Sequence, residues 1–237
     1  MQKKVAVAIP IYKQNLTEND KRSLTQCQKI LGEFPIFFIQ PEELNNASYK
    51  SIIPNSNQIS FSPNYFKSIQ GYSQLMLSPQ FYAKFKDYEY VLIYQTDAYV
   101  FSNQLKFWCD KNYDYIGAPW LSKPPLVKGK PIVDMTPWFI NKVGNGGFSL
   151  RKVRTHYLNT LIFRPFLKYF IKNEDMFWGL FIEWLNPFFK KPNYQEASNF
   201  AIEMDKDIAF KFTNGQLPFG VHAWEKYEFE FWKNWVR

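Results

Sequence analysis

A run of five apolar residues at 90–94 (YVLIY), followed at once by Gln95-Thr96-Asp97, constrains the fold more than any other part of the sequence. A strand with no polar position must be covered on both faces, so this run predicts a central strand of an α/β sheet. Ligands of open α/β sheets bind outside the carboxyl ends of the strands. Gln95 and Asp97, two residues apart, would point to the same side of an extended chain at that end.

The first forty residues predict a strand, a helix and a second strand. Residues 5–9 and 35–39 are apolar runs, and residues 15–32 between them carry apolar side chains at helical spacing. Thr17 is suited to the start of that helix, and Gly32 is suited to its end. Because such a unit closes as a right-handed crossover, we expect a mostly parallel sheet flanked by helices.

The pattern is less regular in the remainder of the chain. Residues 65–85 have a helical pattern interrupted at a proline, residues 107–114 predict a short helix, and residues 115–120 predict a strand and a turn. Residues 121–141 contain four prolines and predict a long loop, while residues 151–170 predict a pair of helices. Long loops in compact domains are often functional.

Size and charge narrow the classes of protein. A chain of 237 residues suits one α/β domain, and no linker divides it. The net charge of +8 favours anionic partners, but no unbroken run of Lys and Arg indicates a nucleic-acid-binding arm. Two cysteines fit a reducing compartment. Without a signal peptide or a membrane-spanning stretch, we expect a cytoplasmic protein that can rest on the inner face of the membrane.

Four polar positions far apart in the sequence are candidates for chemistry, and each has an ordinary structural alternative. Asp97 can hold Mg²⁺ or Mn²⁺, or it can cap the next turn. Residues 144–147 (GNGG) allow a ligand to approach the backbone, or they form a plain turn. Glu174 and Asp175 can supply a general base, or they can begin a helix. His222 can bind a metal or a diphosphate, or it can be a satisfied core residue.

In this order, the four segments resemble the pattern of GT-A glycosyltransferases, in which an apolar strand ends in an Asp-x-Asp motif. Residues 114–120 (DYIGAPW) and 144–151 (GNGGFSLR) also resemble signatures of an uncharacterised bacterial and fungal glycosyltransferase-like family. The resemblance covers roughly residues 5–224. It implies a GT-A (Rossmann-like) α/β fold and one domain over residues 1–237. The nucleotide-binding part would span about 1–110, and the acceptor side about 111–237.

The resemblance also implies an activity. The enzyme would be of the hexosyltransferase type and would move a sugar from a nucleotide-sugar donor to a glycan or lipid-linked acceptor, with inversion. The setting would be synthesis of a bacterial surface polysaccharide, namely lipopolysaccharide, O-antigen or capsule. Asp175 would be the base beside Glu174, and Asp97 and His222 would hold Mn²⁺ or Mg²⁺. Gln95 replaces the first Asp of the usual motif, which leaves strict metal dependence open.

Two sets of binding residues follow from the same resemblance. The donor would be bound by Pro10, Tyr12, Lys13, Gln95, Thr96, Asp97, Asn145, Gly146, Gly147 and His222. The acceptor would stack on Trp120, Trp138 or Trp178, although each of these rings can equally be an anchor of the core or of a loop.

Other interpretations remain open at this stage. A non-catalytic nucleotide- or carbohydrate-binding module would keep the aromatic rings, and a nucleotidyltransferase would also use a metal-binding Asp. A nucleic-acid-binding protein would fit the charge, but no motif supports it. The aromatic and basic residues 161–172 can rest on anionic lipid or can be an ordinary amphipathic helix of the core.

Overall fold

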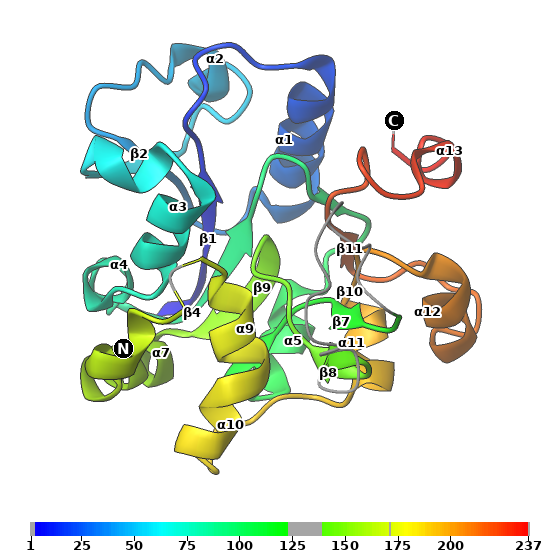
Figure 1. Ribbon diagram of the computed structural model, residues 1–237. Coiled ribbons are helices and arrows are strands. Elements are labelled where there is room, and N and C mark those ends of the chain that lie inside the picture. The colour runs from blue at the N-terminus through cyan, green and yellow to red at the C-terminus, as the bar shows by residue number, and fades with distance from the viewer. Residues whose placement is uncertain (1–2, 123–138, 171, 237) are drawn as a thin grey trace, which may run out of the picture.

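The computed structural model describes residues 3–122, 139–170 and 172–236 and is built around one six-stranded sheet (Figure 1). The strands are β1 (Lys3–Pro10), β2 (Ile36–Pro41), β3 (Asn57–Phe61), β4 (Tyr88–Tyr94), β6 (Tyr115–Ile116) and β9 (Phe148–Lys152). Their order is β3-β2-β1-β4-β9-β6. The first four run parallel, and β9 is antiparallel to both of its neighbours. The predicted mostly parallel α/β sheet is confirmed.

The predicted central strand is β4, which pairs with β1 on one side and with β9 on the other. Residues 90–94 are fully buried. Tyr90, Leu92 and Tyr94 belong to the core on one face of the sheet, while Val91 and Ile93 belong to the core on the other. This alternation is the two-residue period of a strand covered on both faces.

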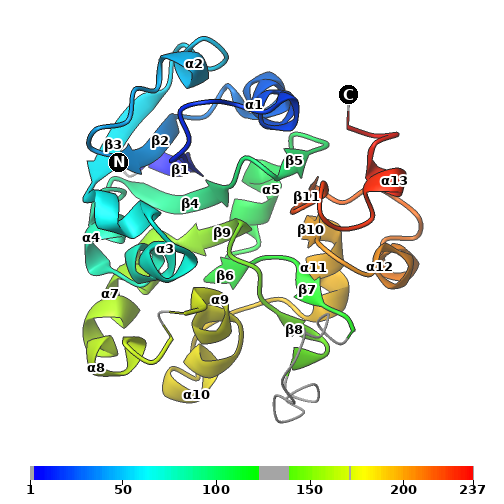
Figure 2. The same cartoon turned by 45° about the horizontal axis from the view of Figure 1, so that its top comes forward.

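Helices cover each face of the sheet (Figures 1 and 2). The core on one face includes residues of α1 (Glu18–Leu31), α2 (Ala47–Lys50) and α5 (Leu105–Asp110). The core on the other includes residues of α3 (Ile69–Met76), α4 (Pro79–Ala83), α7 (Val153–Ile162), α8 (Arg164–Leu167), η2 (Phe177–Phe181) and α10 (Ile182–Leu185), with η1 (Pro63–Phe66) packed against it. The cap predicted at Thr17 is present, since Thr17 and Asp20 form a capping box at the start of α1.

Smaller elements from the second half of the chain, together with β5, lie beside the main sheet. β5 (Tyr99–Val100), β10 (Ala201–Ile202) and β11 (Gly220–Val221) form a second sheet, and β7 (Pro119–Trp120) pairs with β8 (Lys142–Val143). The remaining helices are α9 (Glu174–Met176), α11 (Tyr194–Phe200), α12 (Lys206–Phe212) and α13 (Phe229–Trp232). The second sheet matters for the site, because β10 and β11 end beside the carboxyl end of β4.

The interruption predicted at Pro79 is present, since α3 ends at Met76 and Pro79 begins α4, where Ser78 caps it. Two local predictions need correction. The helix expected over 107–114 is α5, which begins at Leu105 and ends at Asp110. The helix pair expected from residue 151 begins at Val153, since residues 151 and 152 still pair with β4. Among the described residues, no helix has the length and apolar character needed to cross a bilayer.

Candidate active site

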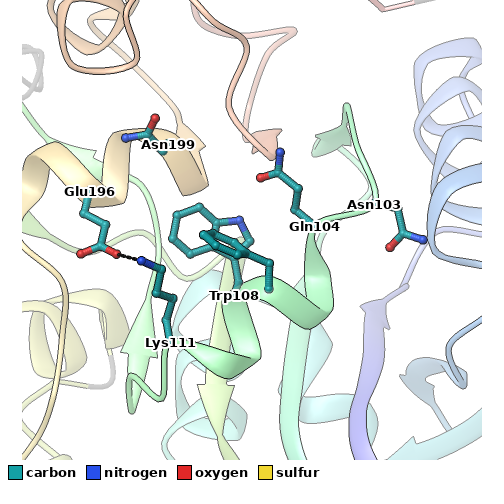
Figure 3. A pocket seen from close by; sticks show the side chains of 7 residues that line it. Asn103, Gln104, Trp108, Lys111, Glu196 and Asn199 are labelled. Carbon is teal, nitrogen blue, oxygen red and sulfur yellow. Dashed lines mark ion pairs between the residues drawn. The ribbon is translucent and has the colours of Figure 1, made fainter.

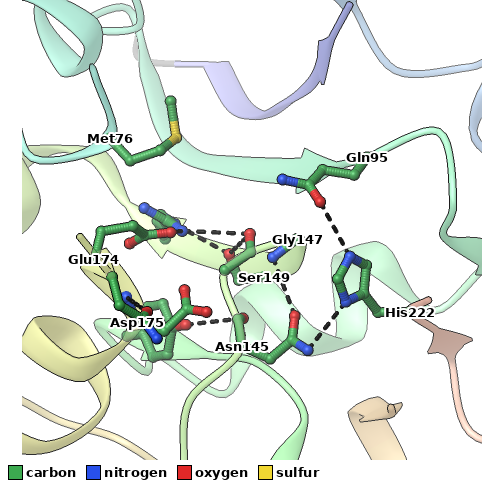
Figure 4. A network of polar contacts seen from close by, with 12 residues as sticks. Met76, Gln95, Asn145, Gly147, Ser149, Glu174, Asp175 and His222 are labelled. Atoms are coloured by element: carbon green, nitrogen blue, oxygen red, sulfur yellow. Dashed lines mark hydrogen bonds and ion pairs between the residues drawn. The ribbon is translucent and has the colours of Figure 1, made fainter. Parts of the chain in front are cut away.

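Polar side chains from segments far apart in the sequence meet at the carboxyl end of β4, among them Gln95, Asn145, Glu174 and His222 (Figure 4). The backbone of residues 145–147, immediately before β9, runs alongside this end, and the Gln95 N–H donates to the Gly147 carbonyl at 2.9 Å. Asp97 and His222 lie on one side of these glycines, and Glu174 and Asp175 lie on the other. The four sequence segments singled out above are therefore neighbours in space.

His222 is the centre of the first cluster. It follows β11, whose antiparallel pairing with β5 brings it next to the end of β4. Its Nε2 lies 3.2 Å from Asp97 Oδ1 and 3.1 Å from Gln95 Oε1. Its Nδ1 lies 3.2 Å from Glu203 Oε1, and Glu203 directly follows β10. Because β10 and β11 are parallel neighbours, the side chains after their carboxyl ends meet.

Attraction between opposite charges stabilises the charged forms of His222 and Asp97 in this cluster. Burial alone would lower the pKa of His222, but Asp97 and Glu203 raise it to about 10. Burial would raise the pKa of Asp97, yet the pKa is lowered, chiefly by the charge of His222 and the hydrogen bond to it, with a smaller contribution from Lys13. At neutral pH the pair is therefore an imidazolium and a carboxylate.

The cluster offers part of a metal donor set. Asp97, Gln95 and the Nε2 of His222 converge on one point, and the Nδ1 of His222 faces a carboxylate, as it does in many metal-binding histidines. No group of three His, Cys, Asp or Glu side chains in the described part of the chain is placed to hold a metal ion. A hard cation here would need further oxygen ligands, which phosphates and water supply in many Mg²⁺ sites.

The second cluster is built on a buried ion pair. Arg151 points from β9 into the interior, is fully buried, and donates to Glu174 Oε1 at 2.8 Å. It also donates to the Tyr82 hydroxyl at 3.0 Å and to Ser149 Oγ at 3.0 Å. Ser149 in turn donates to the Gly146 carbonyl at 2.9 Å. This network fixes the first residue of α9 against the glycine segment.

Asp175 stands beside that ion pair with an unusual proton affinity. Asn173, rather than either acid, caps α9, since its Oδ1 accepts from the Asp175 N–H at 3.1 Å. Burial of the Asp175 carboxyl and the neighbouring charge of Glu174 raise its pKa well above the usual range. A carboxyl with raised proton affinity, on a residue that as a whole is only partly buried, is suited to general acid–base work.

The glycines are required where they stand. A Cβ on Gly146 would lie 1.9 Å from Glu174 Oε1 and 2.3 Å from Asp175 Oδ1, and one on Gly147 would lie 2.0 Å from His222 Nε2. Both clusters therefore reach the glycine backbone at contact distance. Asn145, with φ of 64°, shapes the turn, because its Oδ1 accepts from the Gly147 N–H at 3.0 Å. The amide of Asn145 also lies 3.0 Å from His222 Nδ1.

The remaining donor candidates lie at the neighbouring strand end. Pro10 is buried as the last residue of β1, which is the parallel neighbour of β4. Tyr12 is 59% exposed, and the ammonium of Lys13 lies 5.7 Å from its ring centroid. Thr96 is partly exposed in the turn after β4.

The three tryptophans proposed to contact the acceptor differ in exposure and packing. Trp120 is partly exposed, and its ring packs against Gly144 and Gly179, where an added Cβ would lie 2.0 and 3.0 Å from ring carbons. Trp178 is fully buried, with its ring 4.2 Å from that of His156. The prediction that Trp178 stacks on an acceptor is therefore wrong, because neither face of its ring is accessible. Trp138 lies outside the described residues.

Sequence reasoning assigned no role to two residues of the site, Arg151 and Glu203. Arg151 is two residues from Ser149 in β9, so strand alternation could have placed these two polar side chains on the same face of the sheet. Glu203 follows the apolar run at 200–202 in the same way that the Gln-Thr-Asp segment follows β4. That signal is weak because β10 has only two residues.

A surface hollow elsewhere on the molecule contains none of these residues (Figure 3). It measures about 500 Å³ between α5 and α11 and is lined by Asn103, Gln104, Phe107, Trp108, Lys111, Glu196 and Asn199. Lys111 and Glu196 form an ion pair across it at 3.1 Å. The hollow is thus separate from the two carboxylate clusters.

Comparison with solved structures defines the class of fold. An active-site mutant of the glycosyltransferase LgtC matches with a TM-score of 0.55 at 15% identity, over 92% of this chain and 86% of that chain. Another LgtC structure, a galactosyltransferase in complex with donor and acceptor sugar analogs, matches with a TM-score of 0.52 at 14% identity over the same shares. Mouse xyloside xylosyltransferase 1 matches with a TM-score of 0.53 at 10% identity, over 92% of this chain and 97% of that chain. The protein thus has the GT-A glycosyltransferase fold.

The family follows from a sequence model. The chain belongs to the family DUF5672, described as "Protein of unknown function", whose model matches residues 55–222. That range contains the end of β4, the glycine segment, both acids of α9 and His222. Among curated proteins, no sequence matches this chain.

Proposed function

We propose that this protein is a glycosyltransferase that moves a sugar from a nucleotide-sugar donor to a hydroxyl of a glycan or lipid-linked acceptor, with inversion. The observation that carries the proposal is the placement of Gly146 and Gly147 between two carboxylate clusters of opposite character. Asp97 is paired with a cation, His222, whereas Asp175 has a raised pKa. Glycosyl transfer needs both a stabilised leaving group and a base, and the two clusters that would supply them contact the same glycine segment.

In this scheme, the bond between the anomeric carbon and the diphosphate oxygen breaks while the acceptor oxygen bonds to the same carbon. The acceptor proton goes to Asp175. The charge that develops on the diphosphate is stabilised by His222 and by the side-chain ammonium of Lys13. Asp97, with Gln95, would hold Mn²⁺ or Mg²⁺, a Lewis acid for the diphosphate, and His222 would join them as a ligand only where the metal displaces the proton from its Nε2. Pro10, Tyr12 and Thr96 would surround the rest of the nucleotide.

We further propose one domain over residues 1–237, in which about 1–110 binds most of the nucleotide and about 111–237 faces the acceptor. Trp120 would remain as the aromatic contact to the acceptor. The biological setting would be the cytoplasmic synthesis of a bacterial surface polysaccharide such as lipopolysaccharide, O-antigen or capsule.

The test uses Asp175→Asn, which keeps the shape of the side chain and removes the base. We expect transfer from a panel of nucleotide sugars to fall at least about a hundredfold, the usual contribution of a general base, while nucleoside diphosphate binding is unchanged. Asp110→Asn, an exposed acid on α5, is the matched control. Wild-type transfer by Asp175→Asn would show that the base lies elsewhere.

A second variant tests the leaving-group side. Asp97→Ala should weaken nucleoside diphosphate binding in Mn²⁺, measured by calorimetry, and unchanged affinity would remove Asp97 from the donor site. The same assays separate the alternatives. A binding module would bind nucleotide without any turnover, and a nucleotidyltransferase would release pyrophosphate from a nucleoside triphosphate and a sugar phosphate.

A further inference from the structure

Exposed apolar side chains gather at one end of the molecule. Of the thirteen large hydrophobic residues that are exposed in the described chain, eight lie between residues 158 and 188. Five belong to α7, α8 and the turn that follows, namely Leu158, Leu161, Ile162, Phe166 and Tyr169. Three belong to α10 and the turn that follows, namely Trp184, Leu185 and Phe188. Large apolar groups exposed together on a folded domain indicate an interaction site.

These two groups of exposed residues, the one on α7 and α8 and the one on α10, lie side by side. The Asn186 side-chain amide donates to Asn159 Oδ1 at 3.2 Å, which links the end of α10 to α7. The rings of Phe170 and Phe181 are 4.7 Å apart, and those of Phe181 and Trp184 are 5.6 Å apart, which links the turn after α8 to α10. Figure 2 shows α8 and α10 next to each other at the same end of the molecule. We call the exposed residues of 154–172 and 184–188 the α8–α10 surface.

The charge of this surface has one sign. No Asp or Glu occurs between Arg151 and Asn173, and the exposed cations of the segment are Arg154, Arg164, Lys168 and Lys172. None of these four forms an ion pair with any residue that the structure describes. In the α10 part of the region, Glu183 is the acidic residue of the helix, and it forms an ion pair with Lys191 at 3.2 Å.

Rings and aliphatic side chains mixed with unpaired cations fit the interface of an anionic bilayer. The apolar groups enter the headgroup region, and the cations meet lipid phosphates. A second copy of the chain fits less well, because two surfaces of the same sign would repel each other. We propose that the α8–α10 surface docks on anionic phospholipid.

The position of this surface matters for the acceptor. α9, η2 and α10 follow one another without a break from Glu174 to Leu185. At about 1.5 Å per residue, Asp175 lies roughly 15 Å along the helical segment from Leu185. If the function proposed above holds, docking would bring a lipid-linked acceptor within reach of the base. The docking itself does not require that function.

The test measures sedimentation with vesicles of phosphatidylcholine alone or mixed with phosphatidylglycerol. We expect the wild type to bind the mixed vesicles in a salt-sensitive way and to bind neutral vesicles weakly. R164E/K168E should weaken binding to the mixed vesicles at least about tenfold, since each basic residue near an anionic surface contributes about a factor of five. If the wild type bound neutral and mixed vesicles equally well, the proposal would be overturned.

A matched control separates local from overall charge. K29E/K50E changes two exposed lysines on α1 and α2, so it lowers the net charge of +8 by the same four units. This variant should bind within about twofold of the wild type. An equal loss in both variants would mean that diffuse charge, and not the α8–α10 surface, attracts the lipid.

The apolar part is tested with Phe188→Ser, whose side chain is 86% exposed and can be changed without disturbing the core. It should weaken binding to mixed vesicles severalfold, whereas Phe107→Ser on α5 should not. Sedimentation velocity adds the last arm, because a dimer that Phe188→Ser dissociates would assign the surface to a second copy and overturn the proposal. Nucleotide is absent from every assay, so a failed glycosyltransferase test leaves these results unaffected.

Discussion

Two aspartates at the same edge of the sheet have opposite electrostatic surroundings. Asp97 faces His222, and its pKa is lowered, while Asp175 faces Glu174 and has a raised pKa. Burial acts in the same direction on both, since it favours the neutral carboxyl. The neighbours therefore decide the difference, and they divide the site into a half whose two groups are charged at neutral pH and a half that can exchange a proton. Such a separation of two carboxylates is typical of acid–base enzymes.

The largest expected effect comes from removing the cation of the proton-exchanging half. Arg151→Met leaves the buried Glu174 carboxylate without its partner, and breaking a buried ion pair in this way costs about 3–5 kcal/mol. We expect urea unfolding at pH 7 to show a free energy of unfolding lower by that amount. The charged half around Asp97 makes no hydrogen bond to Arg151 and should keep its geometry.

The double variant Arg151→Met/Glu174→Met tests the physical reason. Replacing both partners by apolar side chains removes the uncompensated charge, and such replacements are often neutral or stabilising. The double variant should therefore recover most of the lost stability. A double variant as unstable as Arg151→Met would mean that the hydrogen bonds to Tyr82 and Ser149, rather than the charge of Glu174, make Arg151 important.

The two glycines allow each half to be disturbed separately. Gly146→Ala would push a methyl group against Glu174 and Asp175, and Gly147→Ala would push one against His222. Overpacking of this kind costs about 1–3 kcal/mol, so both variants should unfold at lower urea concentration. Gly146→Ala should also lower transfer with nucleoside diphosphate affinity retained, and Gly147→Ala should lower that affinity. If both variants changed the same step, the two halves would not act separately.

Strand positions were the part of this architecture most open to prediction from sequence. The apolar runs at 5–9 and 90–94 determined which strands are buried on both faces, because a polar side chain in either would have faced one of the two cores. The capping box at Thr17 was equally readable, since it depends on residues three positions apart. Local chemistry was sufficient in each case.

Contacts between distant segments were harder to predict. The sequence identified His222 and Asp97 as candidates, but the second sheet that joins them has strands of only two residues, too short for a periodic signal. Trp178 was proposed for the acceptor from its proximity to the acids in sequence. In the structure, the helical turn after Asp175 directs it toward His156 and the core. Side-chain direction, and not sequence distance, decided its role.

The smallest expected effect is a pH dependence of the free energy of unfolding, which should differ between the two histidines. The pKa of His222 is raised to about 10, so its charged form stabilises the folded state fully below the unfolded pKa of about 6.5. That contribution is lost as the pH rises from about 6.5 through 10. The free energy of unfolding of the wild type should therefore fall toward that of His222→Gln over this window, measured by urea unfolding at several pH values.

His156 provides the control, because burial and the charge of Arg151 hold its pKa well below 6.5. It is neutral in both states above that pH, and the difference between the wild type and His156→Gln should stay constant there. A parallel pH dependence for both variants would mean that the imidazolium at the Asp97 side does not contribute to stability, and the contrast between the two halves of the site would then rest on Asp175 alone.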